Sequence, residues 1–223
     1  IKYTGSYSLI EGNTIKSTLG LKTEDLKIIE TFISSAASEE AEEAILNQII
    51  SKIPVGISLD MMSDYSIVRD NTLMGFQLAI NVMDSEGVQI LNNHIDGACQ
   101  LNLDGGPATG EIHTTAGINY PMLLEKAGKK GKSLYAVILL NTNSSLISGN
   151  KIRCTLFGIV SLGSSNVHIA TNHFSKGQLG IALYWGNSAK VSENIIEDIH
   201  YGGLFLSEKT GLTTITHNRI AFC

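Results

Sequence analysis

Short apolar segments that bend at an asparagine recur along this chain. Each segment has an aliphatic residue, two spacers, an asparagine, one spacer and a second apolar residue. Because side chains alternate between the two faces of a strand, both apolar positions can point inward across a bend at the asparagine. Seven segments fit the pattern: residues 9–15, 67–73, 90–95, 146–152, 168–174, 190–196 and 214–220.

The spacing of the asparagines sets the length of one repeat. Successive asparagines lie 58, 22, 57, 22, 22 and 24 residues apart, so one coil has about 22 residues and two coils carry long insertions. Asparagine tolerates the left-handed backbone of a bend, and asparagines stacked in neighbouring strands hydrogen-bond as a ladder. We therefore interpret seven residues as a structural ladder rather than as a metal or sugar site: Asn13, Asn71, Asn93, Asn150, Asn172, Asn194 and Asn218.

A third strand, led by glycine or alanine, follows each asparagine after about eight residues. It occurs at residues 56–59, 79–82, 136–139, 158–161, 180–183 and 203–206. Three short strands per coil predict an all-β, single-stranded parallel β-helix that spans residues 1–223 as one domain. A leucine-rich repeat is rejected, because its leucine spacing and helix-length segments are missing from the coils.

Two insertions interrupt this solenoid at the same corner, before the Gly/Ala-led strand. Residues 18–53 carry helical apolar spacing and end at Pro54, so this insertion is expected to be helical. Residues 98–133 are rich in glycine and threonine and are expected to form a loop with a short helix near 122–130. Because they leave alternate coils, both insertions should flank the Gly/Ala-led strands.

Composition narrows the possible partners. The net charge is −5 with no basic run, which argues against nucleic acid, and no apolar run is long enough to span a membrane. The cysteines Cys99, Cys154 and Cys223 are odd in number and contain no C-x-x-C pair. We therefore expect buried or idle thiols rather than a disulfide framework or a zinc site, and no metal site or cofactor is predicted.

The repeats resemble those of the pectin-lyase-like right-handed parallel β-helix superfamily, which includes carbohydrate-active enzymes and phage tailspikes. The resemblance implies a right-handed helix, a polysaccharide as the partner, and a location outside the cell or on a cell or virion surface. By resemblance alone, calcium is a possible cofactor and the Gly/Ala-led sheet is the place of a substrate cleft. Neither end shows a cap, so flanking coils or a partner subunit are expected to cover both ends.

The outward positions of the Gly/Ala-led strands carry no acid, base or arginine. They are Ser58, Asn81, Ile138, Val160, Ala182 and Phe205. Glycoside hydrolysis needs two carboxylates, so this face argues against ordinary catalysis. An outward apolar stripe must be covered or must bind something, and the insertion helix at 18–53 is the simplest cover.

Polar candidates lie after the ladder asparagines. His94, Lys151, Arg153 and His173, beside Asp96 and Glu197, are expected to point outward and could meet an anionic sugar. The alternative is a solvated strand face with cross-strand charge pairs, such as Asp96 beside Arg153.

Other candidate residues lie outside this strand face. Tyr184 and Trp185 could stack on a sugar or pack under a neighbouring turn. His113 in the second insertion is a lone candidate for a functional histidine. Asp198, His200 and Tyr201 form a possible acid–base group, although nothing in the sequence shows that they converge.

Three functions remain open from the sequence. The first is polysaccharide recognition with weak or no catalysis. The second is a polysaccharide lyase, hydrolase or epimerase whose catalytic residues come from the insertions or from coils outside this window, with His113, Asp96 and Arg153 as candidates. The third is a structural or assembly module, because the fold alone does not fix the function.

Overall fold

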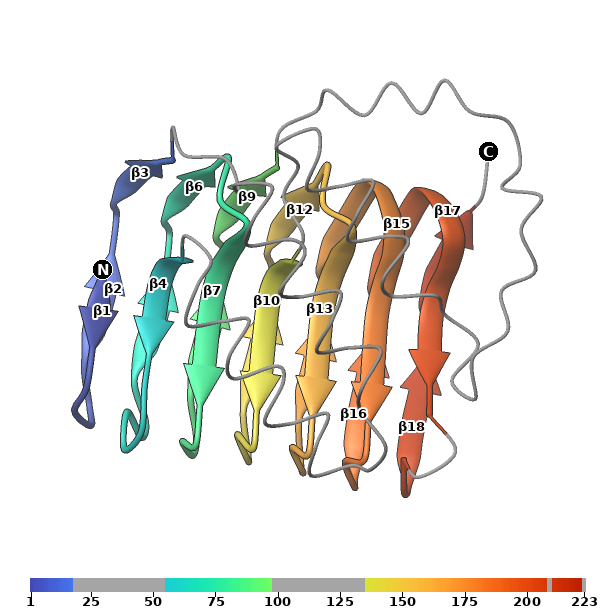
Figure 1. The fold of residues 1–223 in the computed structure, drawn as a ribbon. Coiled ribbons are helices and arrows are strands. Elements are labelled where there is room, and N and C mark those ends of the chain that lie inside the picture. The colour runs from blue at the N-terminus through green and yellow to red at the C-terminus, as the bar shows by residue number, and fades with distance from the viewer. Residues whose placement is uncertain (18–54, 98–134, 208–209, 222–223) are drawn as a thin grey trace, which may run out of the picture.

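The computed structural model describes residues 1–17, 55–97, 135–207 and 210–221. These residues form strands and turns, with no helix among them, and they wind into the expected right-handed parallel β-helix. Figure 1 shows the coils side by side from the N-terminal to the C-terminal end. The two predicted insertions lie outside the described residues.

Each coil contributes strands to three faces, which we name by their place relative to the ladder asparagine. The pre-Asn face is the 7-stranded sheet. Its strands are β2 (Leu9–Glu11), β5 (Ile67–Arg69), β8 (Gln89–Leu91), β11 (Leu146–Ser148), β14 (His168–Ala170), β16 (Ala189–Ser192) and β18 (Thr213–Thr216).

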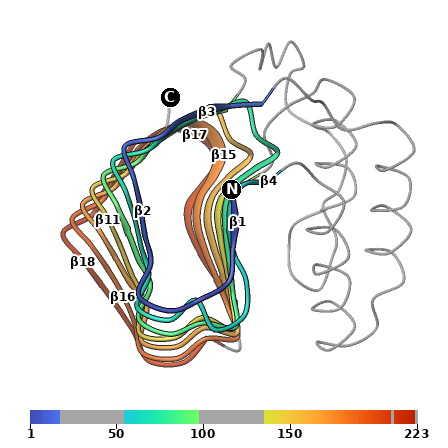
Figure 2. The ribbon, with the colours of Figure 1, turned by 90° about the vertical axis from the view of Figure 1, so that its left-hand side faces the viewer.

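The other two faces belong to one 12-stranded sheet. The post-Asn face holds β3 (Thr14–Lys16), β6 (Thr72–Met74), β9 (His94–Asp96), β12 (Lys151–Arg153) and β19 (Arg219–Ala221). The Gly/Ala face holds β1 (Lys2–Tyr3), β4 (Val55–Leu59), β7 (Leu78–Met83), β10 (Tyr135–Leu140) and β13 (Phe157–Leu162). The long strands β15 (His173–Tyr184) and β17 (Ile195–Leu206) run through both faces, and Figure 2 shows the sheet turning between them.

All seven predicted ladder asparagines stack in one column. In each step the Oδ1 atom accepts hydrogen bonds from the backbone N–H and the Nδ2 of the asparagine one coil earlier. Both bonds that Asn172 donates to the Oδ1 of Asn194 are typical, at 2.9 and 3.0 Å. The ladder therefore satisfies amide groups that would otherwise be buried without partners.

The left-handed residue of this bend is the one before the asparagine, which corrects the expectation for asparagine itself. Positive φ angles occur at Asp70 (55°), Asn92 (52°), Thr171 (54°) and Glu193 (59°), and not at the ladder residues that follow them. The ladder asparagine is therefore required for its hydrogen bonds rather than for its backbone conformation.

The inward columns form the core as predicted. The residues three before each asparagine are buried from Ile10 to Val191, and the column two after each asparagine is buried from Leu73 to Ile196. The leading glycine of β13 also faces this core: a Cβ on Gly158 would lie 2.3 Å from the Gly180 carbonyl oxygen and 2.6 Å from a Phe174 ring atom. A side chain does not fit there because protein interiors are close-packed.

A second, shorter side-chain ladder lies at the opposite corner, between the Gly/Ala and pre-Asn faces. Ser85 accepts from the Ser63 N–H at 3.3 Å, and Ser164 accepts from the Thr142 N–H at 2.9 Å. Ser164 also donates to the carbonyl oxygen of Leu162, two residues earlier, at 3.1 Å. This hydroxyl ladder was not predicted, because serine is common in turns of every kind.

Candidate functional site

The post-Asn face brings together the basic residues that the sequence singled out. Parallel registers place His94 beside Lys151 and Lys151 beside His173, so the three occupy one outward column on successive strands. Neighbouring strands lie about 4.8 Å apart, so these side chains repeat at that interval along the helix axis. Lys151 is exposed and the two histidines are half-buried.

A second column beside it carries charges of both signs. Arg153 Nε lies 3.6 Å from Asp96 Oδ1, and His173 Nε2 lies 2.8 Å from Glu197 Oε1. The predicted cross-strand pair of Asp96 and Arg153 is therefore confirmed. Both pairs are partly exposed, so each contributes little to stability. In each pair, the carboxylate holds the basic side chain in place.

Lys151 forms no ion pair with any described residue, whereas Arg153 and His173 face carboxylates. An anionic ligand along this face would therefore meet one uncompensated ammonium flanked by two imidazoles. This arrangement offers the Lys151 ammonium as a donor between two imidazole rings, of which that of His173 already bonds to Glu197 through Nε2.

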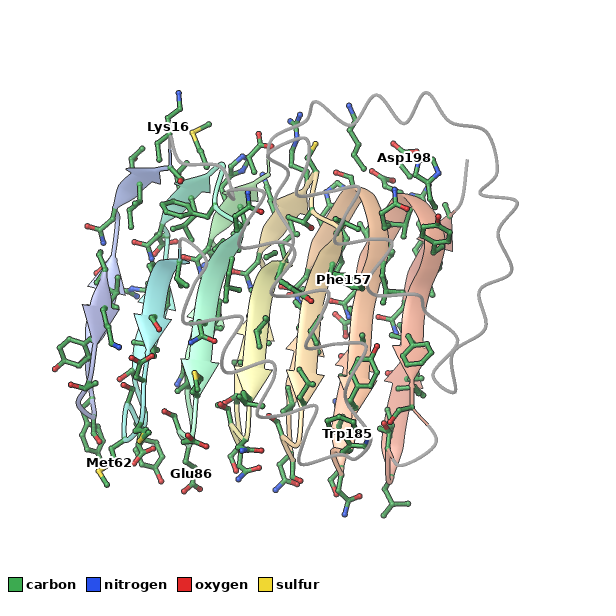
Figure 3. All side chains as sticks on the ribbon, in the orientation of Figure 1. Lys16, Met62, Glu86, Phe157, Trp185 and Asp198 are labelled. Carbon is green, nitrogen blue, oxygen red and sulfur yellow. The ribbon has the colours of Figure 1, made fainter. Side chains whose placement is uncertain are left out.

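Tyr184 and Trp185 lie elsewhere. Figure 3 shows Trp185 at the edge of the solenoid that also holds Met62 and Glu86, opposite the edge that holds Lys16 and Asp198. Tyr184 is only 6% exposed, and its ring centroid lies 5.3 Å from that of Phe205 and 6.0 Å from that of Trp185. Tyr184 is therefore packed against its neighbours, which is the second of the two alternatives that the sequence left open.

The remaining polar candidates do not form a site among the described residues. Asp198, His200 and Tyr201 are exposed on β17 and make no hydrogen bond or ion pair with one another in that part of the chain. His113 lies outside the described residues. Within those residues, no group of three or more His, Cys, Asp or Glu side chains is placed to hold a metal ion.

The outward columns of the Gly/Ala face are buried, although they do not belong to the interior core. Ile138 and Ala182 are 0% exposed and Val160 is 4% exposed. A neighbouring outward pair, Tyr135 and Phe157, stacks with ring centroids 5.0 Å apart, and burial raises the pKa of the Tyr135 hydroxyl. The apolar stripe is thus covered, as expected, while the predicted covering segment lies outside the described residues.

One end of the Gly/Ala face carries an acid and a base, which corrects the expectation that it has neither. Lys2 pairs in register with Ser58, and its Nζ lies 2.7 Å from Asp60 Oδ2. Ser58 donates to Asp60 Oδ1 at 2.6 Å, and Asn81 Nδ2 donates to Ser58 Oγ at 3.2 Å. The hydrogen bond and charge of Asp60 raise the pKa of Lys2.

Two signals in the sequence could have revealed this group. Residues 1–3 occupy the place of the Gly/Ala-led strand in the first coil, and Asp60 is the next outward position after Ser58. Asn81 is fully buried and its Oδ1 has no hydrogen-bond partner.

The expectation of idle thiols is wrong for Cys154, which is disulfide-bonded. Its side chain is 1% exposed and follows β12, beside the charged column of the post-Asn face. The other two cysteines, Cys99 and Cys223, lie outside the described residues. An odd total of three still permits one disulfide, which the spacing of the cysteines did not indicate.

No helix among the described residues is both long enough and apolar enough to cross a bilayer.

Comparison with known proteins identifies the repeats. Residues 130–223 match a family model described as a right-handed β-helix region, which agrees with the right-handed parallel β-helix that the repeats predict. A search of curated proteins gave no match. Among solved structures, a DFA-IIIase from Arthrobacter chlorophenolicus A6, in complex with GF2, aligns with a TM-score of 0.43 and 10% identity. The alignment covers 95% of this chain, which spans 53% of that enzyme's chain.

Proposed function

Starting from a right-handed parallel β-helix, the fold that pectin-lyase-like proteins share, we propose that this protein recognises an acidic polysaccharide along its post-Asn face, with weak or no catalysis. The column of His94, Lys151 and His173 carries the proposal. A polymer aligned with the helix axis would lie across all three side chains, and the Lys151 ammonium would donate hydrogen bonds to its acidic groups.

The neighbouring charge pairs support a binding role over a catalytic one. Asp96 and Glu197 face basic partners, at 3.6 Å and 2.8 Å. Carboxylates held in this way position the basic side chains. They also repel acidic groups that approach outside the Lys151 column, which contributes to specificity.

The Cys154 disulfide supports an oxidising location, since disulfides persist in secreted and surface proteins and are rare in the cytosol. Such a location is one in which a protein would meet extracellular polysaccharides.

Affinity electrophoresis through gels that contain polygalacturonate or alginate tests the proposal. Retardation of the wild-type protein is expected. Because exposed ion pairs are worth about 0.2–1 kcal/mol, Lys151→Gln should weaken binding by about 1.4- to fivefold. The triple variant with glutamine at His94, Lys151 and His173 should lose retardation.

A matched control is Lys190→Gln, which removes an exposed ammonium from the pre-Asn face and should change nothing. Binding should also weaken as salt rises, because exposed charges are screened within about 10 Å at 0.1 M salt. Equal retardation of the triple variant and the wild type would refute the assignment of this face.

The second candidate, an enzyme acting on polysaccharides, is favoured by the Lys2–Asp60–Ser58 group on the Gly/Ala face. Incubation of the wild-type protein with acidic and neutral polymers, followed by chromatography for shorter products, tests it. If products form, their loss in Asp60→Asn would assign the chemistry to this group, and their loss in the alanine variants of His113, Asp96 or Arg153 would assign it elsewhere.

A further inference from the structure

One corner column holds two tyrosines in the first two coils and small or polar turn residues in the next four. Between the Gly/Ala and pre-Asn faces, six successive coils each place one residue in the left-handed backbone region, and in the first five of them its N–H donates to a backbone carbonyl of the next coil. The residues of this column and their φ angles are Tyr7 (59°), Tyr65 (55°), Gly87 (64°), Ser144 (53°), Asn166 (56°) and Ser188 (57°).

Stability does not account for this choice of residue. A left-handed conformation costs a residue with a Cβ on the order of 1–2 kcal/mol, whereas glycine and asparagine adopt it readily. The Tyr7 and Tyr65 rings stack with centroids 5.4 Å apart and planes 17° apart, and such a pair contributes about 0.5–1.5 kcal/mol. Stacking thus offsets at most part of the backbone cost of two tyrosines.

Burial adds little for Tyr7, which is 78% exposed, and offsets only part of the cost of the pair through Tyr65, which is 47% exposed. The exposed Met61 and Met62 lie in the turn that leads to Tyr65, so a sizeable apolar surface gathers at this corner. Exposed aromatic and apolar surface of this kind more often marks a binding site than contributes to the stability of the fold.

The pair is also held in a fixed arrangement. A Cβ on Gly87 would lie 2.5 Å from the Tyr65 ring, so the glycine leaves the space that this ring occupies. Ser6 donates from its hydroxyl to the Met62 carbonyl oxygen at 2.9 Å and ties the turns of the first two coils together. A preorganised aromatic surface loses little conformational entropy on binding.

Charge separates this corner from the post-Asn face. Exposed or half-buried carboxylates surround the tyrosines, namely Asp60, Asp64, Asp84 and Glu86. In the described part of these turns only Lys2 offers an opposite charge, and it contacts Asp60. Figure 3 shows Met62 and Glu86 at this edge of the solenoid.

We infer that Tyr7 and Tyr65 form a stacking platform for the ring of an uncharged sugar. The apolar C–H face of the sugar lies on a tyrosine ring, and its hydroxyls donate to nearby carboxylate oxygens such as those of Glu86. The surrounding negative charge repels acidic sugars. This site is separate from the post-Asn face, so binding of neutral sugars here and binding of acidic polysaccharides there can be tested and refuted independently.

Affinity electrophoresis with neutral polymers tests the platform, using hydroxyethylcellulose, galactomannan, xyloglucan and inulin. At least one should retard the wild-type protein. Tyr7→Asn and Tyr65→Asn should each weaken that retardation by about five- to tenfold, as expected for the loss of one aromatic contact. Because asparagine suits the left-handed backbone, both variants should keep the wild-type thermal midpoint.

Tyr7→Trp should retain binding, and Ser144→Asn, in the same column but away from the rings, should match the wild type. The inference is overturned if no neutral polymer retards the protein, or if the asparagine variants bind unchanged. A fall in their thermal midpoint of more than about 4 °C would overturn it too, by showing that the tyrosines stabilise the fold. Retardation by cationic chitosan and by no neutral polymer would also overturn the inference, because it would indicate recognition of charge rather than stacking on a sugar ring.

Discussion

Replacing a ladder asparagine in the middle of the solenoid should cost far more stability than replacing one at its end. Asn150 is fully buried. Its Oδ1 accepts from the N–H and Nδ2 of Asn93 at 2.9 and 3.0 Å. Its Nδ2 donates to Ile90 O, Ser148 O and Asn172 Oδ1 at 2.9–3.1 Å. Asn150→Ala therefore deprives several buried groups of partners at once.

The magnitude follows from these contacts. A buried polar group left without its partner costs about 1–3 kcal/mol, and the Asn93 N–H and the Ile90 carbonyl are both affected. We expect Asn150→Ala to lower the free energy of unfolding by about 3–5 kcal/mol in total. For a chain of this size, that corresponds to a fall in thermal midpoint of roughly 6–20 °C.

Asn13→Ala is the matched control, because Asn13 is only half-buried and its Oδ1 accepts no hydrogen bond from a described residue. Its loss should cost about 1 kcal/mol. Urea unfolding followed by circular dichroism, with a thermal scan of each variant, measures both. If Asn150→Ala were no less stable than Asn13→Ala, the ladder would not be the source of stability that its geometry indicates.

Gly158→Ala should destabilise the fold by about 2–4 kcal/mol in urea unfolding, because the new methyl group would overlap the Gly180 carbonyl oxygen and the Phe174 ring; an unchanged midpoint would contradict this packing. Burial and, secondarily, the charge of Lys190 lower the pKa of His168 below its ordinary 6.5. As the pH falls through 6.5, this histidine is protonated in the unfolded chain before it is protonated in the folded protein, so the free energy of unfolding decreases. His168→Gln should flatten this part of the stability–pH profile, and an identical slope in both proteins would exclude the histidine as the cause. Reduction with dithiothreitol should lower the thermal midpoint of the wild type but leave Cys154→Ser unaffected, since a disulfide typically contributes about 2–5 kcal/mol.

The inward positions could be predicted from the sequence because each is constrained in the same way in every coil. Ile147 stacks between Ile90 and Ile169 in register, so a polar residue at any one of them would leave a gap in a continuous core. The ladder could be predicted for the same reason, because an asparagine that must hydrogen-bond to its equivalents in both neighbouring coils recurs at a fixed place in the repeat. The sequence is periodic because each coil makes these same contacts with its neighbours.

Features that depend on only one or two coils were harder to predict. Lys2 and Asp60 meet because the first strand pairs with β4, although 58 residues separate them in sequence. The disulfide of Cys154 likewise joins positions for which the repeat offers no guide. The sequence left the role of Tyr184 open, because it places this residue after an apolar strand without showing that Phe205 packs against it.

The outward columns nevertheless contain a usable signal, which is departure from the residue type that a column otherwise holds. In the left-handed corner column, glycine, serine and asparagine satisfy the backbone, so Tyr7 and Tyr65 need a reason beyond folding. On the post-Asn face, nothing about the core requires His94, Lys151 and His173 to follow one another, since their side chains point away from it. In a solenoid, each coil repeats the structural requirement, and selection for binding acts on the residues that break the repetition. Substituting such residues with the type found elsewhere in their own column should therefore remove binding while leaving the fold intact, which is the outcome that both proposed sites predict.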